Sequence, residues 1–285
     1  MKLRSGDNKK LTRGQERTRV LITTAVPIET DAVLRAGPPA TMFEKKDHLT
    51  AWGWIMNDYE IWLVETGVGL KRAIMTTRAA IDWLRPIAVI GLGLAGAVSA
   101  ELNDGELVVP ETVAWISNPE LRISASPELT KFASSINDPQ ITFLPVANTM
   151  TVPRLFYRND KLRLSRRVKD CAVLDMESYG LGWVCKSEEI PFMILRSISD
   201  SQRRTMPPWW FFMKMAKAHS VLFRLGLACL FPHYALLLAR LHRACRQAAR
   251  VNGRGFWLFM SSWVQSPLAG AARPATTQAI TRLSG

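Results

Sequence analysis

Hydrophobic residues between positions 20 and 210 fall into short apolar runs that alternate with stretches of helical periodicity. The apolar spacing predicts helices most clearly at 70–84 and in the segment that ends before Pro191. Runs typical of buried strands occupy residues 20–25, 87–90, 106–110, 142–146 and 192–198. This alternation predicts one α/β domain with helices on both sides of a sheet.

A β-hairpin is predicted near the N-terminus. Residues 52–57 and 60–65 alternate in polarity on either side of an Asn-Asp turn. The second strand leads into Gly67, and a helix is expected to begin at about Leu70. Glycines at a helix start leave backbone N–H groups free for an anion or a polar ligand, although such turns are more often plain connectors.

Three carboxylates stand where predicted strands meet other elements. Glu29 follows the first strand at the start of a helix, Glu177 precedes another helix, and Asp200 follows the strand at 192–198. In open α/β sheets, ligands bind beyond the carboxyl ends of the strands. We therefore interpret the three as candidate site residues. For Glu29, a charge that is merely favoured by the helix dipole fits the local pattern equally well.

Residues 91–96 read GLGLAG, a literal match to the glycine pattern of dinucleotide-binding folds. That pattern requires a crossover helix of about a dozen residues after the glycines, whereas only residues 97–103 precede the next turn. We therefore exclude an NAD or FAD site and expect no cofactor. The glycines are expected to let the backbone approach a flat ligand closely.

The formal net charge of +13 is concentrated at the two ends of the chain. Residues 1–19 carry seven Lys or Arg against two acids, and residues 211–285 carry ten and none, which leaves 20 bases and 22 acids in the body. This distribution disfavours nucleic-acid binding, since the body has no recognition pattern. We expect residues 1–19 to form a flexible basic tail and not a signal peptide, because no sufficient apolar region follows.

Cysteine usage points to a reducing compartment. Four cysteines among 285 residues, without paired spacing, are typical of buried thiols in a cytosolic protein. No metal site is expected, because no zinc-binding spacing is matched by Cys229, His233, His242 and Cys245.

The segment 211–252 is apolar and basic at once. Arg224 and Pro232 interrupt it, and a membrane-spanning helix needs about 20 mostly apolar residues, so a span is not expected. An amphipathic helix at a membrane surface fits the pattern, and an ordinary terminal helix packed on the body fits it equally. Residues 253–285 are expected to be loosely structured. The basic face would carry Arg240, Arg243, Arg246 and Arg250.

Five motifs together are more specific than any one of them. In order they are TTAVPIE, ETGVGLKRA, IAVIGLGLAGAVSAELNDGELVVPE, LDMES and PFMILRSISD. Over residues 20–201 this combination resembles the purine nucleoside phosphorylase and methylthioadenosine/adenosylhomocysteine nucleosidase superfamily. The resemblance implies that residues 20–210 form a single three-layer catalytic domain, with a mixed central β-sheet flanked by helices.

A finer resemblance concerns one branch of that superfamily. The Asp-Met-Glu-Ser motif, the Met-Pro-Pro that follows the aspartate and the basic apolar C-terminus are most similar to the hopanoid-associated phosphorylases. That branch is implied to remove adenine from adenosylhopane and to leave ribosylhopane.

The resemblance implies a role for each carboxylate in breaking a ribosyl C–N bond. Asp200 would donate a proton to purine N7, Glu177 would accept hydrogen bonds from the ribose hydroxyls, and Glu29 would activate water. Partial burial at the strand end is expected to keep Asp200 protonated.

The resemblance also implies a set of substrate-binding residues. Residues 94–96 would line a flat base pocket, with an aromatic ring of the 155–160 loop stacked on the base. One methionine would pack against the sugar, and an arginine and a serine would orient the water and Asp200. The implied set is Gly67, Leu94, Ala95, Gly96, Phe156, Tyr157, Met176, Arg196 and Ser199.

Water is favoured over phosphate as the nucleophile. A phosphate site needs cations and N–H donors, whereas residues 91–96 lack the Arg and Ser usual in the phosphorylases, and Glu29 would repel phosphate. Phosphate as a co-substrate stays open, because Lys71 or Arg72 beside Gly67 could supply a cation.

Two departures from the family pattern bear on the substrate. Ser178-Tyr179 stand where the family usually has small residues after the glutamate, and Leu94 stands where the phosphorylases have a serine. Both changes favour a nucleoside with a bulkier or more apolar 5′ substituent. The expected partners are therefore a lipid-linked purine nucleoside and an anionic membrane surface, for a cytoplasmic homodimer peripheral to the inner membrane. The alternatives are a general methylthioadenosine/adenosylhomocysteine nucleosidase, a phosphorylase, and a membrane-associated nucleoside-binding protein. The three carboxylates argue against the last.

Overall fold

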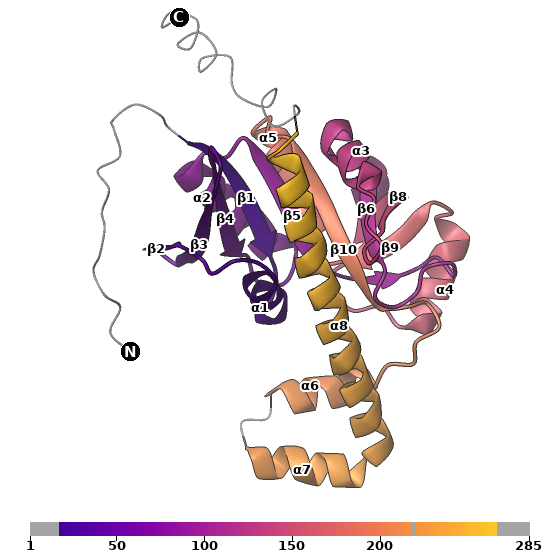
Figure 1. Cartoon of the computed structure of the whole chain (residues 1–285). Coiled ribbons are helices and arrows are strands. Elements are labelled where there is room, and N and C mark those ends of the chain that lie inside the picture. The colour runs from indigo at the N-terminus through magenta and orange to yellow at the C-terminus, as the bar shows by residue number, and fades with distance from the viewer. Residues whose placement is uncertain (1–16, 218–219, 267–285) are drawn as a thin grey trace, which may run out of the picture.

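A computed structural model describes residues 17–217 and 220–266 of the chain (Figure 1). Most of the predicted 1–19 tail and residues 267–285 lie outside the described residues. The elements in chain order are β1 (Thr18–Thr24), α1 (Pro27–Ala36), β2 (Met42–Lys46), β3 (Leu49–Met56), β4 (Tyr59–Glu65), α2 (Leu70–Leu84), β5 (Ala88–Ala97), β6 (Leu107–Trp115), β7 (Asn118–Ser124), α3 (Pro127–Ser135), β8 (Phe143–Thr151), α4 (Arg158–Arg167), β9 (Cys171–Asp175), α5 (Ser178–Ser187), β10 (Phe192–Asp200), α6 (Trp209–Lys217), α7 (Val221–Leu230) and α8 (Pro232–Trp263).

The described strands form one mixed sheet. β1 is parallel to β4 and β5, and β5 is parallel to β10. β10 pairs antiparallel with β6, β6 is parallel to β8, and β8 is parallel to β9, which returns antiparallel to the end of β5. These five strands close on themselves, while β3 and β2 extend the other edge and β7 pairs with β6.

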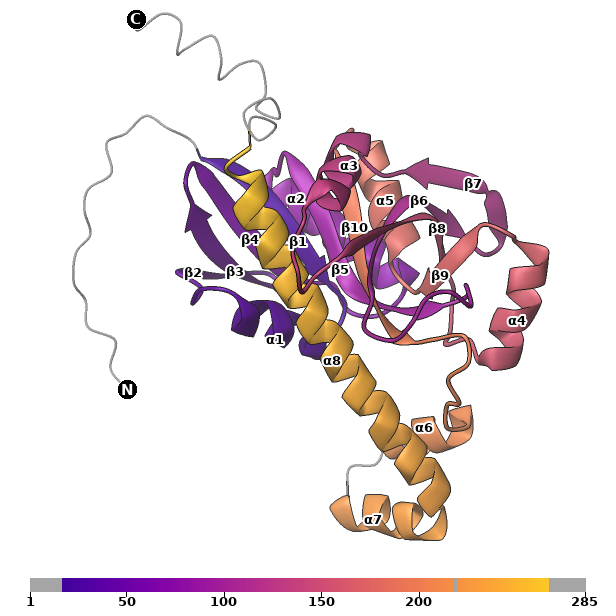
Figure 2. The same ribbon diagram turned by 45° about the vertical axis from the view of Figure 1, so that its right-hand side comes forward.

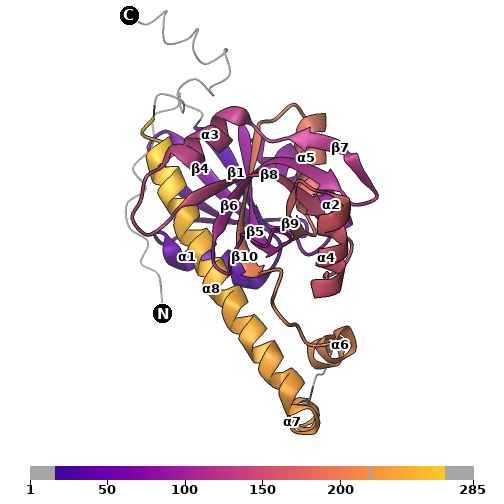
Figure 3. The ribbon, with the colours of Figure 1, turned by 90° about the vertical axis from the view of Figure 1, so that its right-hand side faces the viewer.

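Helices cover both faces of the sheet, which confirms the three-layer α/β prediction (Figure 3). Val20 and Ile22 of β1 pack in one core cluster with α8, α1 and α3. Leu21 points to the opposite face and packs with α2 and α5. Successive side chains of a strand alternate between the two faces, so the uninterrupted apolar run of β1 matches a strand that is covered on both sides.

The β3–β4 hairpin and the helix at 70–84 are confirmed. Several strands are longer than the apolar runs that predicted them. β5 continues from Ala88 through the glycines to Ala97, because those residues pair with both β10 and β9. A strand for which the apolar pattern gave no prediction, β7, also forms between β6 and α3.

The expectation of a loosely structured segment after Gly253 is wrong for residues 253–263. They belong to α8, whose 32 residues make a helix of about 48 Å. Pro232 begins this helix instead of breaking it, because proline is tolerated in the first helical turn. Phe256 and Phe259 are completely buried in the core.

Gly253 is needed for the close packing of α8 on the body. A Cβ atom at this position would lie 2.5 Å from the carbonyl oxygen of Ala32 in α1, so the two helices could not cross as closely with any side chain there. Gly253, which in the sequence suggested a loop, therefore lies where α8 crosses α1. The last third of α8 is an ordinary core helix.

Beyond β10, the chain builds a projection that we call the arm: α6, α7 and residues 232–243 of α8. The arm extends away from the sheet in all three views (Figures 1–3). Among the residues that the structure describes, no single helix has the length and apolar character to cross a membrane. α7 and α8 meet those criteria only as a pair, bent by 112° at their junction. The arm exposes large apolar side chains at Trp210, Val221, Phe223, Leu225, Leu230 and Leu236.

Candidate active site

The three candidate carboxylates lie at the carboxyl ends of neighbouring strands. Glu29 stands in the first turn of α1 directly after β1, Glu177 follows β9 and precedes α5, and Asp200 is the last residue of β10. β1 and β10 both pair with β5, and β9 pairs with its end. The topology therefore brings these groups to one edge of the closed part of the sheet.

Glu29 is buried and held by backbone N–H groups. Its Oε2 accepts from the amides of Ala25 (2.8 Å) and Val26 (3.2 Å), and its Oε1 accepts from the amide of Leu94 (2.9 Å). Burial raises the pKa of Glu29, and these hydrogen bonds together with Arg196 oppose the rise. The amide of Leu94 thus fixes the carboxylate, a role that the sequence did not suggest for this residue.

Glu177 lies on the turn that joins β9 to α5. Its Oε1 accepts from the amide of Gly69 at 2.8 Å, which joins the predicted glycine turn before α2 to the site. Desolvation, followed by the negative charge of Asp175, raises the pKa of Glu177 to about 7. Near neutral pH the side chain therefore exchanges readily between a carboxylate and a carboxylic acid.

Arg196 is completely engaged by the protein. Its Nε donates to Asp175 Oδ2 at 2.8 Å and its Nη2 donates to Ser178 Oγ at 2.8 Å, while Nη1 donates to the carbonyl oxygen of Gly91 at 3.2 Å. Asp175 also accepts from Thr151 Oγ1 at 2.8 Å. A buried ion pair is tolerated when hydrogen bonds satisfy its remaining groups, as they do here.

A small cavity opens between these two networks. Arg196 and Glu177 face it, together with the ends of β1 and β4 around Thr24 and Thr66. Glu29 lies close enough to act electrostatically on Arg196 and on Glu177. The cavity holds about 10 Å³, room for one water molecule beside the guanidinium, the carboxylate and the hydroxyl groups.

Asp200 has a partner that the sequence did not predict. The ammonium group of Lys161 from α4 forms a short ion pair with Asp200 Oδ2 and donates to the backbone oxygen of Asp200 at 2.8 Å. The hydroxyl of Ser199 lies 2.8 Å from Asp200 Oδ1. The expectation for Asp200 considered burial alone and did not include this ammonium group.

The glycines of β5 make room for the site residues themselves. A Cβ atom at Gly93 would lie 3.1 Å from Glu29 Oε1 and 3.0 Å from Arg196 Nη1, and one at Gly96 would lie 2.8 Å from Asp200 Oδ2 and 2.9 Å from Lys161 Nζ. The expected close approach of this backbone is therefore to protein carboxylates, and this explains the alternating glycines without a dinucleotide.

The remaining predicted residues lie around this centre. Met176 and Phe156 are partly buried and pack against the same hydrophobic cluster. Tyr157 is the residue that precedes α4, the helix that carries Lys161. Ser199 is also 3.3 Å from the carbonyl oxygen of Ala95. At the opposite end, the side chain of Arg72 lies over Gly67.

Four residues of this arrangement escaped sequence reasoning: Lys161, Asp175, Cys245 and Asn252. Asn252 of α8 donates to the carbonyl oxygens of Gly93 (3.0 Å) and Leu195 (3.2 Å). Cys245, also of α8, hydrogen-bonds Ser199. Asp175 lies in the LDMES motif and could have been found from it. Lys161 sits in a helix whose many basic residues are typical of a solvent-exposed face, and its burial depends on the tertiary structure.

Comparison with known proteins identifies the family. The model of the phosphorylase superfamily matches residues 19–223. The chain therefore belongs to the phosphorylase superfamily, and it is an enzyme of the nucleosidase and nucleoside phosphorylase type.

Curated relatives include two 5′-methylthioadenosine/S-adenosylhomocysteine nucleosidases. That of Buchnera aphidicola subsp. Schizaphis graminum is 26% identical over 156 residues, which are 50% of this chain and 66% of the relative. That of Geobacillus sp. strain WCH70 is 25% identical over 162 residues, 51% of this chain and 69% of the relative. The matched stretch thus spans about two thirds of the length of these relatives.

Solved structures share the fold at lower identity. A Helicobacter pylori 5′-methylthioadenosine/S-adenosylhomocysteine nucleosidase superimposes with a TM-score of 0.69 at 17% identity, covering 87% of this chain and all of the other. The futalosine hydrolase of Helicobacter pylori gives a TM-score of 0.67 at 16% identity, covering 86% of this chain and 98% of the other.

Proposed function

We propose that this protein hydrolyses the N-glycosidic bond of an adenine nucleoside that carries a large apolar 5′ substituent, with adenosylhopane as the substrate and ribosylhopane and adenine as products. The observation that carries the proposal is the meeting of Glu29, Glu177 and Asp200 at one edge of the sheet, each in a different environment. A protein that only binds a nucleoside has no need of three such carboxylates.

Each environment suits one part of the reaction. Glu177 in its ionised form accepts hydrogen bonds from the ribose hydroxyls and stabilises the positive charge that develops on the sugar. Glu29 takes the proton of a water molecule that attacks C1′. Asp200, at the opposite end of the site, delivers a proton to N7 as the electron pair of the C1′–N9 bond moves into the purine.

Water is preferred to phosphate because of how Glu29 is held. Its two oxygens accept from three backbone amides, so the N–H donors that could bind an oxyanion are directed at the protein's own carboxylate. Arg196 is similarly engaged with Asp175 and Ser178. Arg72 beside Gly67 is the cation that a phosphate-dependent reaction would use, and it lies on the exposed side of that turn.

The arm supports a lipid-linked substrate. β10 ends at Asp200, and residues 201–208 lead directly to α6, so the arm begins at the site edge of the sheet. Leu230 and Val221 are 75% and 68% exposed, and Phe223 is 54% exposed. Exposed apolar residues that gather on one projection mark a surface for a lipid or a partner, and the described arm contains no acidic residue.

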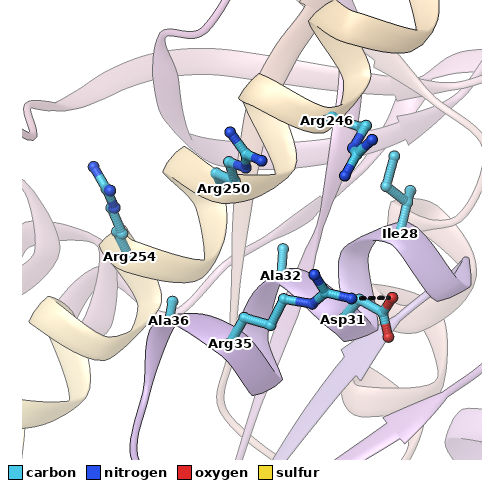
Figure 4. Close-up of a pocket in the computed structure, with 8 residues that line it drawn as sticks. All are labelled: Ile28, Asp31, Ala32, Arg35, Ala36, Arg246, Arg250 and Arg254. Atoms are coloured by element: carbon cyan, nitrogen blue, oxygen red, sulfur yellow. Dashed lines mark ion pairs between the residues drawn. The ribbon is translucent and has the colours of Figure 1, made fainter.

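Basic groups continue from the arm along the outer surface of α8. Arg246, Arg250 and Arg254 line a cleft of about 250 Å³ with Arg35 and Asp31 of α1 (Figure 4). Arg35 lies 3.6 Å from Asp31, and within the described residues the three arginines of α8 form no ion pair. Anionic headgroups of a bilayer would compensate this charge, and a protein peripheral to the inner membrane would meet them there.

Adenine release tests the proposed reaction. Purified protein is incubated with adenosylhopane in vesicles and, separately, with soluble 5′-methylthioadenosine, each with and without phosphate. We expect adenine from adenosylhopane at a rate independent of phosphate, and ribosylhopane as the second product. A strict requirement for phosphate would replace hydrolysis by phosphorolysis, and equal or faster cleavage of methylthioadenosine would favour the general nucleosidase.

A further inference from the structure

The feature that the family relationship does not explain is Lys161. Its side chain is among the most buried charged groups of the described chain, with 2% of the residue exposed. α4 brings it to the end of β10, where the ammonium group contacts Asp200 Oδ2 and, at 2.8 Å, the backbone oxygen of Asp200. The position is also close to Gly96, where an added Cβ atom would lie 2.9 Å from Lys161 Nζ.

Burial of an ammonium group is costly unless a carboxylate and hydrogen bonds compensate it. Asp200 is the carboxylate that pairs with Lys161 within the described residues. Ser199 holds the other oxygen of Asp200, and the absence of a side chain at Gly96 leaves space for the pair. The contact is therefore built from three elements, α4, β5 and β10, and it is buried inside the protein.

This contact conflicts with a resting carboxylic acid at position 200. A carboxylate that accepts a charge-assisted hydrogen bond from an ammonium group is ionised, and an ionised carboxylate has no proton for purine N7. The proton needed by the leaving base is nevertheless present in the pair, because it resides on the nitrogen of Lys161.

We infer that Lys161 is the positioning residue that supplies, through Asp200, the proton received by the leaving purine. This inference rests on the proposed function. As the C1′–N9 bond breaks, its electron pair enters the purine. A proton of the Lys161 ammonium passes to the Asp200 carboxylate, and the carboxylic acid so formed passes a proton to N7. The products of this step are neutral adenine, the Asp200 carboxylate and a neutral Lys161 amine, which solvent reprotonates after adenine has left.

Other charged and titratable groups face this pair from the neighbouring elements. Cys245 of α8 hydrogen-bonds Ser199, and burial raises the pKa of its thiol to about 11. Asp104 accepts from the amide of Ser201 at 2.6 Å and pairs with Arg204 just beyond the strand. Glu29 acts on Cys245 from the side of α1. These groups remain in every variant below, so differences between the variants report on Lys161.

The test measures kcat/KM for adenine release as a function of pH in wild type, K161M, K161R and D200N. The probe is whichever of adenosylhopane and 5′-methylthioadenosine the wild-type enzyme cleaves. K161M lacks the ammonium proton of the pair, so we expect kcat to fall about 10²-fold near neutral pH and the pH profile of kcat/KM to differ from that of the wild type.

K161R separates proton transfer from simple charge pairing. An arginine retains the positive charge but does not release a proton in proteins, so we expect its rate to stay low. Restoration of the wild-type rate and pH profile by K161R would overturn the inference, as would an unchanged pH profile in K161M. Thermal unfolding of each variant checks that it is folded. If K161M does not fold, K161R still tests the inference, because it keeps a positive charge opposite Asp200.

The outcomes also distinguish this inference from the proposed function. An active wild type with an inactive D200N and an unchanged K161M would leave the nucleosidase function standing and remove Lys161 from it. A wild-type protein that releases adenine from neither substrate would overturn both.

Discussion

The sheet edge that carries the site differs from the arm in where its charged and apolar side chains lie. They are buried at the sheet edge and exposed in the arm. In β10 all nine residues are buried, including Arg196 and Asp200, and both of these charges are paired. In the arm, Leu230 and Val221 are largely exposed and no acidic residue is present. The charged groups at the end of β10 are paired within the protein, whereas the exposed apolar side chains of the arm have no such partners among the described residues.

A single helix connects the two regions. The C-terminal third of α8 fills the core, where Phe256 is fully buried. Farther toward the arm, Asn252 donates to β5 and β10, and Cys245 hydrogen-bonds Ser199. The arm is thus fixed to the strands that carry the reacting groups, and substitutions can be chosen that disturb one region and spare the other.

The largest effect is expected from Asp200→Asn. An amide cannot pass a proton to the base, so kcat should fall by about 10³-fold or more, while vesicle binding by the arm is unchanged. Asp104→Asn, which alters a more exposed carboxylate beyond the same strand, is the matched control and should retain most of the activity. Adenine release by both variants, with thermal unfolding as a check, measures this. Near wild-type activity in Asp200→Asn would remove the proposed proton donor.

The second prediction compares two helical glycines. Gly253 lies against α1, where an added Cβ atom would be 2.5 Å from the oxygen of Ala32, whereas Gly226 in the arm has open space. Gly253→Ala should lower the free energy of unfolding by about 1–3 kcal/mol, and Gly226→Ala should raise it by about 0.4–1 kcal/mol. Denaturant unfolding measures both. Equal effects would mean that α8 is not packed on α1 in solution.

The third prediction concerns the pKa of Glu177, which burial and Asp175 raise to about 7. Because ribose binding requires the carboxylate, kcat/KM should rise with pH up to about pH 7. Stability should change in the opposite direction. The folded state retains the proton on Glu177 at pH values where the unfolded chain has lost it, so stability is fully present below about pH 4.5 and is lost as the pH rises through about 7.

Glu177→Gln separates these two effects. The variant should be inactive, yet at pH 8 it should unfold about 2–8 °C higher than wild type, since it buries no charge beside Asp175. Melting temperatures from pH 5 to pH 8 provide the measurement. A wild-type melting temperature that rises over this range, in parallel with the variant, would contradict the assigned environment.

The smallest effect is expected from the arginines of the cleft. Arg246→Gln with Arg250→Gln should lower the partition constant onto anionic vesicles about 30-fold, since each basic residue near such a surface contributes about 1 kcal/mol. Cleavage of a soluble nucleoside should not change. Arg166→Gln with Arg167→Gln on α4 is the charge-matched control on the body. Equal losses in the two double variants would indicate a general charge effect and not a membrane-facing cleft.

The carboxylates could be found from the sequence because their positions depend on local order. Glu29, Glu177 and Asp200 each adjoin a strand end, and apolar runs mark those strands reliably. The path of α8 was not predictable in the same way, since Pro232 and Gly253 carry the composition of breaks. Pro232 lies in the first turn of α8, where proline is tolerated. Gly253 lies against the backbone of α1, where a side chain would not fit.

By itself the sequence determined the α/β class, the hairpin and the positions of three carboxylates at strand ends, because periodicity and element order are local properties. Only the tertiary structure decided which groups surround those carboxylates. Lys161 reaches Asp200 across 39 residues of sequence, and Gly69 reaches Glu177 across 108. Such contacts set the charge of each carboxylate through burial and pairing, and these quantities exist only once distant segments are packed together.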